Sequence, residues 1–477
     1  MTDPVKQSID YSQKYFALLE EFFTRATGKT ALEFSSIETF NEVVRASARD
    51  IGPRGEDAFT WLDAEFRPFL ASEGLGAFSN AKQLGGVNLV LGGSSRFGRS
   101  QLNATSATVL YSDTVLIPDP VAPWMETERE EEKFRHVLLL QAAHALLHLK
   151  PLVDAGLSSP PVVVFPSWEK LLEDNDPQTQ VGIAQLFADV MSNFLGESLS
   201  SLEEVLEYSD RNPDQTMQTV DRNQLLVAPG GPIGEPLVEA LERYETEVAV
   251  WRSEDWVEGY RRLPPHRRAI SGVLERLGPI YHLLENAEEL SASPLMSVEQ
   301  QAHYFRLISK TSNTRLSELG VLDPGTGAIL DALGSQRLRW IGGVAVETLV
   351  ELRENNENLR FREIMNSCIQ RLSEGELNDI DRVAAEVCRD LDIAISEHER
   401  ELREIQEKYD RVHGQTAVVA LAAAGAALMP ALAPLLGTVA PLAVAAKYGH
   451  DKIAELSEKR DAARSVLGVL ALSRPSD

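Results

Sequence analysis

The sequence predicts a mainly α-helical protein with a small α/β unit that contains a βαβ element, ending in a long helical hairpin with an apolar tip. Runs of β-branched residues alternate with a strong helix pattern before residue 166, whereas almost the whole chain after residue 235 follows helical spacing. In addition, residues 414–446 contain no charged side chain. The expected domains are a helical domain of residues 1–73, an α/β domain of residues 74–230, a helical domain of residues 231–372 and the hairpin of residues 373–477.

Residues 5–71 are expected to form three helices. Large side chains recur at helical spacing in the first helix, which predicts that they form a packed core. Ser35 and Glu38 have the spacing of a capping box, so we expect another helix to begin there and to continue to Asp50. The stripe in the first helix consists of Tyr11, Tyr15, Phe16, Leu19, Phe22 and Phe23.

The α/β unit is predicted from short segments rich in residues that favour strands. A strong helix pattern at 126–150 precedes the last of them, and strand, helix and strand at this spacing favour a parallel βαβ unit. Residues 101–110 are expected to form a turn and a strand, and a further helical pattern covers residues 176–208. The expected strands are residues 87–91, 108–111, 114–117, 162–165 and, as a last strand, 225–228.

The apolar stretch 414–446 predicts a helical hairpin, because Pro430, Pro434 and Pro441 interrupt it and proline breaks a helix. The first arm, residues 415–429, would reach roughly 22 Å, short of the roughly 30 Å hydrocarbon layer of a bilayer. Apolar residues upstream alternate at spacings of three and four, as in a coiled coil, so the hairpin is expected to extend a long amphipathic helix. They are Ile395, His398, Leu402, Ile405, Tyr409 and Val412.

Two roles remain open for this stretch. Its tip engages a membrane or a helical partner protein, or it is buried as core or as the interface of a homo-oligomer. Exposed in water, it would exceed the apolar patch that soluble monomers usually show. The side chains expected to make the membrane or partner contact are Val418, Leu421, Leu428, Met429, Leu432, Leu435, Leu436, Val439 and Leu442.

The charge balance excludes one class of function. The chain has 46 Lys and Arg against 72 Asp and Glu, a net charge of −26, and such an acidic body repels phosphate backbones. No nucleic acid partner is therefore predicted.

Cys368 and Cys388 are too few for a disulfide framework, and the first residues lack the apolar core of a signal peptide. We expect a cytoplasmic protein, with peripheral membrane attachment through 414–446 as the alternative.

Two glycine-containing loops suggest phosphate binding. Residues 93–100 read Gly-Ser-Ser-Arg-Phe-Gly-Arg-Ser, which matches a phosphate-binding loop except that arginine replaces lysine. That motif needs a following helix, whereas turn and strand are expected here, so a glycine-rich hairpin loop is favoured. The second loop contains Gly230, Gly231 and Gly234 before a helix start, where free N–H groups could hold an anion or nucleotide. The alternative there is a plain strand-to-helix connection, and no cofactor is predicted.

Four side chains are weak candidates for metal binding. His144 and His148 have the i, i+4 spacing of zinc sites, but the helix lacks the glutamate of a metalloprotease, which favours buried histidines. Asp113 and Asp119 flank the strand 114–117 and could hold Mg²⁺, although aspartates beside prolines are more typical of turns. No catalytic motif was found.

The favoured function is therefore non-enzymatic: a mostly helical protein whose apolar hairpin engages a membrane or partner. The first alternative is a soluble structural or interaction protein with the hairpin buried. The second is a ligand-binding protein or enzyme built on the α/β unit, with Asp113, Asp119 and the loop 230–234 near one site.

Overall fold

The computed structural model describes most of the chain up to residue 318, and one segment beyond it. The described residues are 3–34, 53–86, 88–92, 97–109, 112–122, 132–166, 178–249, 254–318 and 346–356, with a few single positions between and after these ranges. The apolar tip 414–446 lies outside them. Within this part the protein is mostly helical, with one small parallel sheet, as the sequence predicts.

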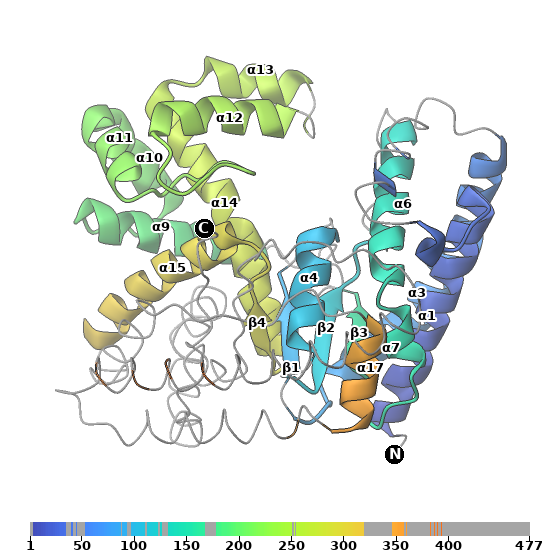
Figure 1. The fold of residues 1–477 in the computed structure, drawn as a ribbon. Coiled ribbons are helices and arrows are strands. Elements are labelled where there is room, and N and C mark those ends of the chain that lie inside the picture. The colour runs from blue at the N-terminus through green and yellow to red at the C-terminus, as the bar shows by residue number, and fades with distance from the viewer. Residues whose placement is uncertain are drawn as a thin grey trace.

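The sheet has four parallel strands in the order β3-β2-β1-β4. They are β1 (Asn88–Leu91), β2 (Thr114–Pro118), β3 (Val162–Phe165) and β4 (Ser293–Leu295). All residues of β1, β2 and β3 are buried, which explains why they read as unbroken apolar runs. Figure 1 shows the sheet between two groups of helices.

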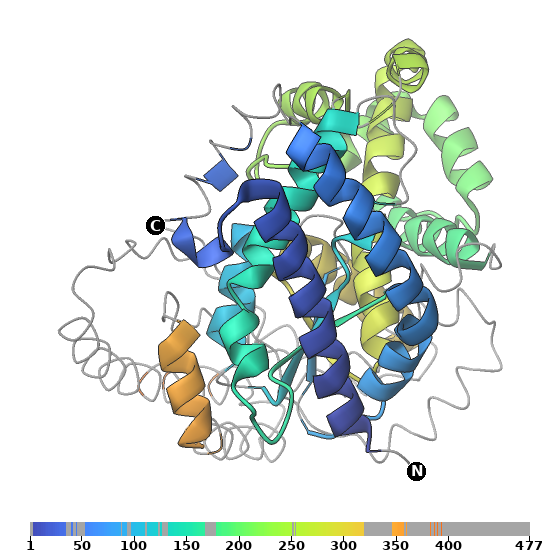
Figure 2. The same cartoon turned by 90° about the vertical axis from the view of Figure 1, so that its right-hand side faces the viewer.

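The first group of helices lies beside β3. α1 (Pro4–Thr27) begins where the Asp3 carboxylate accepts from the N–H of Val5 and ends at Gly28, which has a φ of 77°. α1 packs along α3 (Pro53–Ala81), and both contact β3, with α1 and α3 side by side in front of the sheet in Figure 2. The predicted aromatic stripe of α1 is buried and forms the core here.

Shorter helices connect the strands. α4 (Arg99–Thr108) joins β1 to β2, and α6 (Glu132–Leu147) with α7 (Lys150–Asp154) joins β2 to β3. The parallel pairing of β2 with β3 across α6 and α7 confirms the predicted βαβ unit. A single turn, η1 (Ala31–Glu33), follows α1 and contacts α6.

The second group of helices follows β3 in the chain and returns to the sheet through β4. α14 contacts both β1 and β4, so it carries this group onto the sheet. Later in the chain, α17 contacts α7, the helix that precedes β3 at the edge of the sheet opposite β4. The helices are α9 (Gln178–Leu195), α10 (Leu202–Arg211), α11 (Pro213–Arg222), α12 (Leu237–Ala249), α13 (Glu254–Arg262), α14 (Pro265–Glu289), α15 (Glu299–Glu318) and α17 (Val346–Glu354).

The structure corrects several predicted elements. Residues 101–108 are helical, so the strand expected at 108–111 and the turn and strand expected at 101–110 are wrong. The helix expected at 126–150 is observed as α6, which ends at Leu147, and α7 begins at Lys150. The helical pattern expected at 176–208 is observed as α9 and most of α10. Position 73/74, the expected first domain boundary, falls inside α3, and β4 brings residues of the following helical range into the sheet.

Residues 225–228, expected as a strand, lie in the interior without joining the sheet. The hydroxyl of Tyr304 donates to the carbonyl of Leu225 at 3.2 Å and accepts from the N–H of Val227 at 2.8 Å. A side chain of α15 therefore satisfies backbone groups that a neighbouring strand would otherwise satisfy.

Candidate functional site

The chain between β1 and α4 carries the glycine-containing sequence that resembles a phosphate-binding loop. β1 ends at Leu91, the motif follows, and α4 begins at Arg99, so the helix that the motif requires is present. The N–H of Gly98 donates to Oε1 of Gln101 at 3.1 Å, which caps the first turn of α4. Residues 93–96 lie outside the described part of the chain. One of the two sequence arguments against this loop, the missing helix, is thus removed, whereas the other, Arg99 in place of the lysine, stands.

The strand order places this loop at a topological switch point. From β1 the chain moves through α4 to β2 and then to β3, whereas the later strand β4 pairs on the opposite side of β1. In open parallel sheets, ligands bind outside the carboxyl ends of the two strands where the order reverses. Here these strands are β1 and β4.

Gln301 of α15 bridges the ends of β1 and β4. Its Oε1 accepts from the N–H of Ser297 at 2.8 Å and from the Ser297 hydroxyl at 3.2 Å. Gly92 allows the contact on the other side, since a Cβ there would lie 2.3 Å from Nε2 of Gln301. The switch point is therefore lined by the carboxamide of Gln301, which can donate or accept a hydrogen bond. No pattern in the sequence pointed to Gln301.

Asp119 stands at the carboxyl end of the neighbouring strand β2, where it organises a turn. Its Oδ1 accepts from the Tyr15 hydroxyl at 2.7 Å and from the N–H groups of Val121 and Ala122 at 2.8 and 3.3 Å. Burial, and then the negative charge of Asp119, raise the pKa of Tyr15 well above its usual value, so the phenol stays protonated as the donor.

Asp113 lies at the opposite, amino-terminal end of β2. Five strand residues separate it from Asp119, which at about 3.3 Å per residue puts the two carboxylates on opposite edges of the sheet. A Cβ on Gly86 would meet the Asp113 carboxylate at 2.1 Å. The structure therefore does not bring the two aspartates together at one site.

The loop of Gly230, Gly231 and Gly234 is closed by groups of the chain itself. The N–H of Gly231 donates to the carbonyl of Ala228, and the N–H of Gly234 donates to Oε1 of Gln224, both at 2.9 Å. Positive φ angles of 70° at Gly230 and 96° at Gly234 shape the turn. These backbone donors are already used, which favours a structural connection here.

The carboxylate of Glu235 lies against Gly231 of this loop. Arg243 holds it through Nη2 at 2.7 Å and through Nε at 3.0 Å, and the Glu235 side chain is buried. A Cβ on Gly231 would lie 2.9 Å from Glu235 and 3.1 Å from Cδ of Arg243, so this position needs glycine. A second anion would meet the negative charge of Glu235.

His144 and His148 are neighbours, with ring centroids 4.8 Å apart, but their surroundings are aromatic. The fully buried ring of His144 stacks on Phe40 and Phe23, and its Nε2 donates to the carbonyl of Ala31 at 3.2 Å. Burial, with a smaller effect of His148, lowers the pKa of His144 to about 3, so the ring is neutral at pH 7. In the described part of the chain, no group of three or more metal-ligating side chains comes together.

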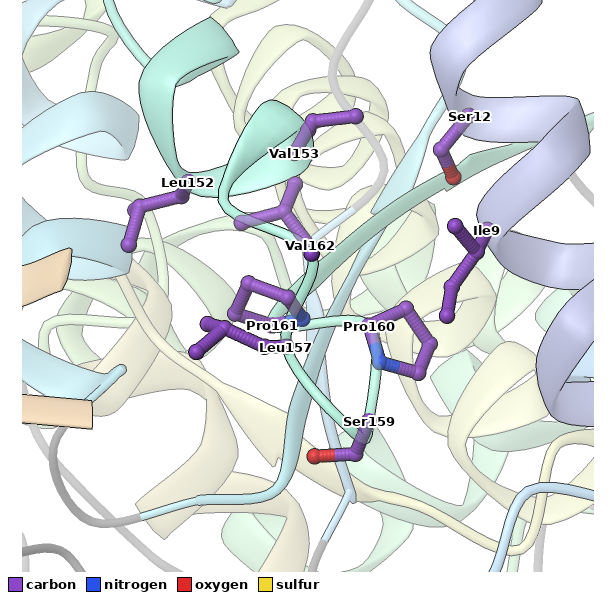
Figure 3. A pocket seen from close by; sticks show the side chains of 10 residues that line it. Ile9, Ser12, Leu152, Val153, Leu157, Ser159, Pro160, Pro161 and Val162 are labelled. Carbon is purple, nitrogen blue, oxygen red and sulfur yellow. The ribbon is translucent and has the colours of Figure 1, made fainter. Parts of the chain in front are cut away.

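A shallow hollow lies at the amino-terminal end of β3, between α1 and the connection from α7 (Figure 3). Its empty space of about 250 Å³ includes space open to solvent, so the enclosed part is far below the roughly 300 Å³ at which ligand pockets usually begin. Its lining is mostly apolar, with Ile9, Leu152, Leu157 and Pro160 around it, and the buried hydroxyl of Ser12 has no hydrogen-bond partner among the described residues. This hollow is too small to indicate a small-molecule site.

The expected membrane or partner contacts, Val418 to Leu442, lie outside the described residues. No described helix combines the length and apolar character needed to cross a bilayer. Comparison of the chain with protein-family models, curated proteins and solved structures gives no significant match.

Proposed function

We propose that this chain is a non-enzymatic protein in which an acidic, mostly helical body carries a C-terminal apolar segment that engages a membrane or a partner protein. The observation that carries the proposal is the uncharged stretch 414–446 in a chain with a net charge of −26. Exposed in water, such a stretch would form an apolar patch larger than soluble monomers usually tolerate. A bilayer or an apolar partner surface would cover it.

The described residues form a core of their own, which supports the proposal that the body folds independently of the apolar segment. This core draws residues from Tyr11 to Leu352 and includes the buried sheet and the helices on both sides. This core accounts for the packing of the described elements among themselves. Removal of residues 416–446 is therefore expected to leave the body folded.

Liposome flotation tests the proposal. The full chain and a variant lacking residues 416–446 are mixed with phosphatidylcholine vesicles, with and without phosphatidylglycerol, and both proteins are analysed by light scattering. The full chain is expected to float and the folded deletion to remain at the bottom. Leu421→Asp and Leu428→Asp, which keep the chain length, are expected to abolish flotation without unfolding the body.

Other outcomes select the alternatives. If the full chain does not float but self-associates, and the deletion is monomeric, the stretch is an oligomer interface. If the deletion or the aspartate variants unfold the body, the stretch is part of the core. Either result would overturn the proposed membrane engagement.

A second candidate function is the binding of a phosphate-bearing ligand at the carboxyl end of β1. The specific observation that favours it is the order of strand, glycine-containing loop and helix at the switch point between β1 and β4. The N-terminus of α4 carries partial positive charge, and Arg99 and Ser100 stand in its first turn.

Thermal-shift measurements with inorganic phosphate, ADP and ATP, each with and without Mg²⁺, test this second function. A saturable rise in Tm that Arg99→Ala and Ser100→Ala remove would support it. Arg222→Ala, at the end of α11, is the matched control. The absence of a Tm shift with all three ligands would exclude phosphate binding at this loop.

A further inference from the structure

Arg353, near the end of α17, inserts its side chain into the amino-terminal end of the sheet. Its Nη1 donates to the carbonyls of Val109, at 2.9 Å, and of Ser112. Its Nη2 donates to the carbonyl of Asp113 at 2.9 Å and to the hydroxyl of Ser159 at 3.2 Å. Only 5% of the residue is exposed, so these bonds form away from water.

The receiving site suits a guanidinium group. The carbonyls belong to the C-terminal end of α4 and to the turn that leads into β2, where unpaired carbonyls concentrate partial negative charge. A planar guanidinium can donate to several acceptors in fixed directions, which a lysine ammonium does less well. Because Ser159 precedes β3, one side chain links the beginnings of β2 and β3.

α17 depends on tertiary packing for its stability, because a helix of nine residues is marginal in water by itself. Leu349 and Leu352 are buried on the same side of the helix as Arg353. The helix then ends, with the N–H of Asn356 donating to the carbonyl of Arg353 at 3.1 Å and Asn356 at a φ of 61°. Docking and folding of α17 are therefore expected to occur together.

We propose that α17 is a releasable strap, which Arg353 fastens to a guanidinium receptor formed by the α4–β2 turn and Ser159. In the docked state, α17 holds the start of the chain after residue 356 at the amino-terminal end of the sheet. In the released state, α17 unfolds while the sheet stays folded. If the apolar segment acts as proposed above, the strap controls how far that segment can move from the body, and this consequence alone depends on the proposed function.

Hydrogen exchange of the full chain tests the strap without any lipid. In Arg353→Ala, the protection of the α17 amides is expected to fall by more than about tenfold, because several charge-assisted hydrogen bonds are lost. Protection in β1, β2 and β3 should stay near the wild-type value. Arg382→Ala, which removes an exposed ion pair with Glu386, is the matched control and should leave α17 unchanged.

Chemical rescue distinguishes a guanidinium receptor from general packing. Low millimolar guanidinium should restore protection to α17 in Arg353→Ala, whereas ammonium at equal ionic strength should not. Arg353→Lys should fall between wild type and Arg353→Ala, and it carries the exchange test if Arg353→Ala does not fold. Unchanged exchange in α17, equal loss of protection throughout the sheet, or equal rescue by ammonium would each overturn the proposal, whatever the result of flotation.

Discussion

The hydroxyl of Tyr15 lies 2.7 Å from Oδ1 of Asp119, so the first helix is bonded to the carboxyl end of β2. Tyr15 is fully buried, and Asp119 is 6% exposed. The contact joins residues 104 positions apart and fixes α1 against the edge of the sheet that the switch-point loop also occupies.

Removal of this hydroxyl is expected to destabilise the protein. Tyr15→Phe takes a donor from the buried carboxylate of Asp119, and hydrogen bonds to charged groups contribute about 1.5 to 3 kcal/mol. Urea unfolding should show a loss in this range. Tyr11→Phe is the matched control, because the Tyr11 hydroxyl is buried without a hydrogen-bond partner among the described residues, and its loss should be neutral or stabilising. Equal losses in both variants would contradict the role of the Asp119 contact.

His144 makes stability depend on pH. Its pKa is about 3 in the folded protein and near 6.5 when unfolded, so the unfolded chain binds more protons between these values and stability falls as pH drops below 6.5. Between pH 6.5 and 4.5 the group should remove about 2 to 3 kcal/mol from the free energy of unfolding.

His144→Phe tests this dependence in urea titrations at several pH values. The variant should be less stable at pH 7, since the bond to Ala31 is lost, but its stability should decline less steeply toward pH 4.5. Parallel curves for wild type and His144→Phe would refute the assignment of the pH dependence to His144.

A side chain at Gly92 is expected to displace the carboxamide of Gln301. Its Cβ would lie 2.3 Å from Nε2 of Gln301, the flexible end of that side chain, so Gly92→Ala should cost about 1 kcal/mol, the value of the bond to Ser297 that is lost when the carboxamide turns away. The double variant with Gln301→Ala should recover part of the loss, a coupling that a double-mutant cycle measures. Gly98→Ala, whose Cβ would meet Gln101 at 3.8 Å, should be close to neutral. Additive effects of the two substitutions would show that the contact does not exist.

Arg243→Ala should destabilise the loop that precedes α12, because it leaves the buried carboxylate of Glu235 without its guanidinium partner. Arg243 is 44% exposed in its side chain, so we expect a moderate loss of stability, smaller than that of a fully buried pair. Arg262→Ala removes a pair with Glu258 that is exposed on both sides and should change stability by less than about 0.5 kcal/mol. Thermal unfolding of both variants compares them, and equal Tm shifts would contradict the difference in burial.

Residue patterns predicted the buried strands and the α1 stripe because burial on both faces, or along one stripe, leaves a periodic record in the sequence. The sequence of α4 shows no such periodic pattern of apolar residues. Its residues include Asn103, Thr105 and Thr108, which are weak helix formers, and packing overrides their preference. β4 has three residues, one of them Pro294, and is a strand because β1 pairs with it.

The candidate sites were less predictable than the fold. Asp113 and Asp119 flank one strand, yet flanking residues lie at opposite ends, so sequence proximity gave a false impression of one site. Arg353 and Gln301 make contacts with residues far away in the chain, and no local spacing marks either of them. The loop at Gly230 looked open because the sequence does not show that Arg243 holds the carboxylate of Glu235 against Gly231.

The pairing of β1 with β4 also shapes how the chain is made. β1 can pair with β2 soon after both strands leave the ribosome. The other edge of β1 stays unpaired until β4 is synthesised, roughly 200 residues later. At usual rates of synthesis this takes about 10 to 40 s. During that interval an apolar strand edge has no native neighbour and is open to pairing with other chains. Nascent chains of this protein should therefore depend on chaperones, and slower translation after residue 165 should lower the soluble yield.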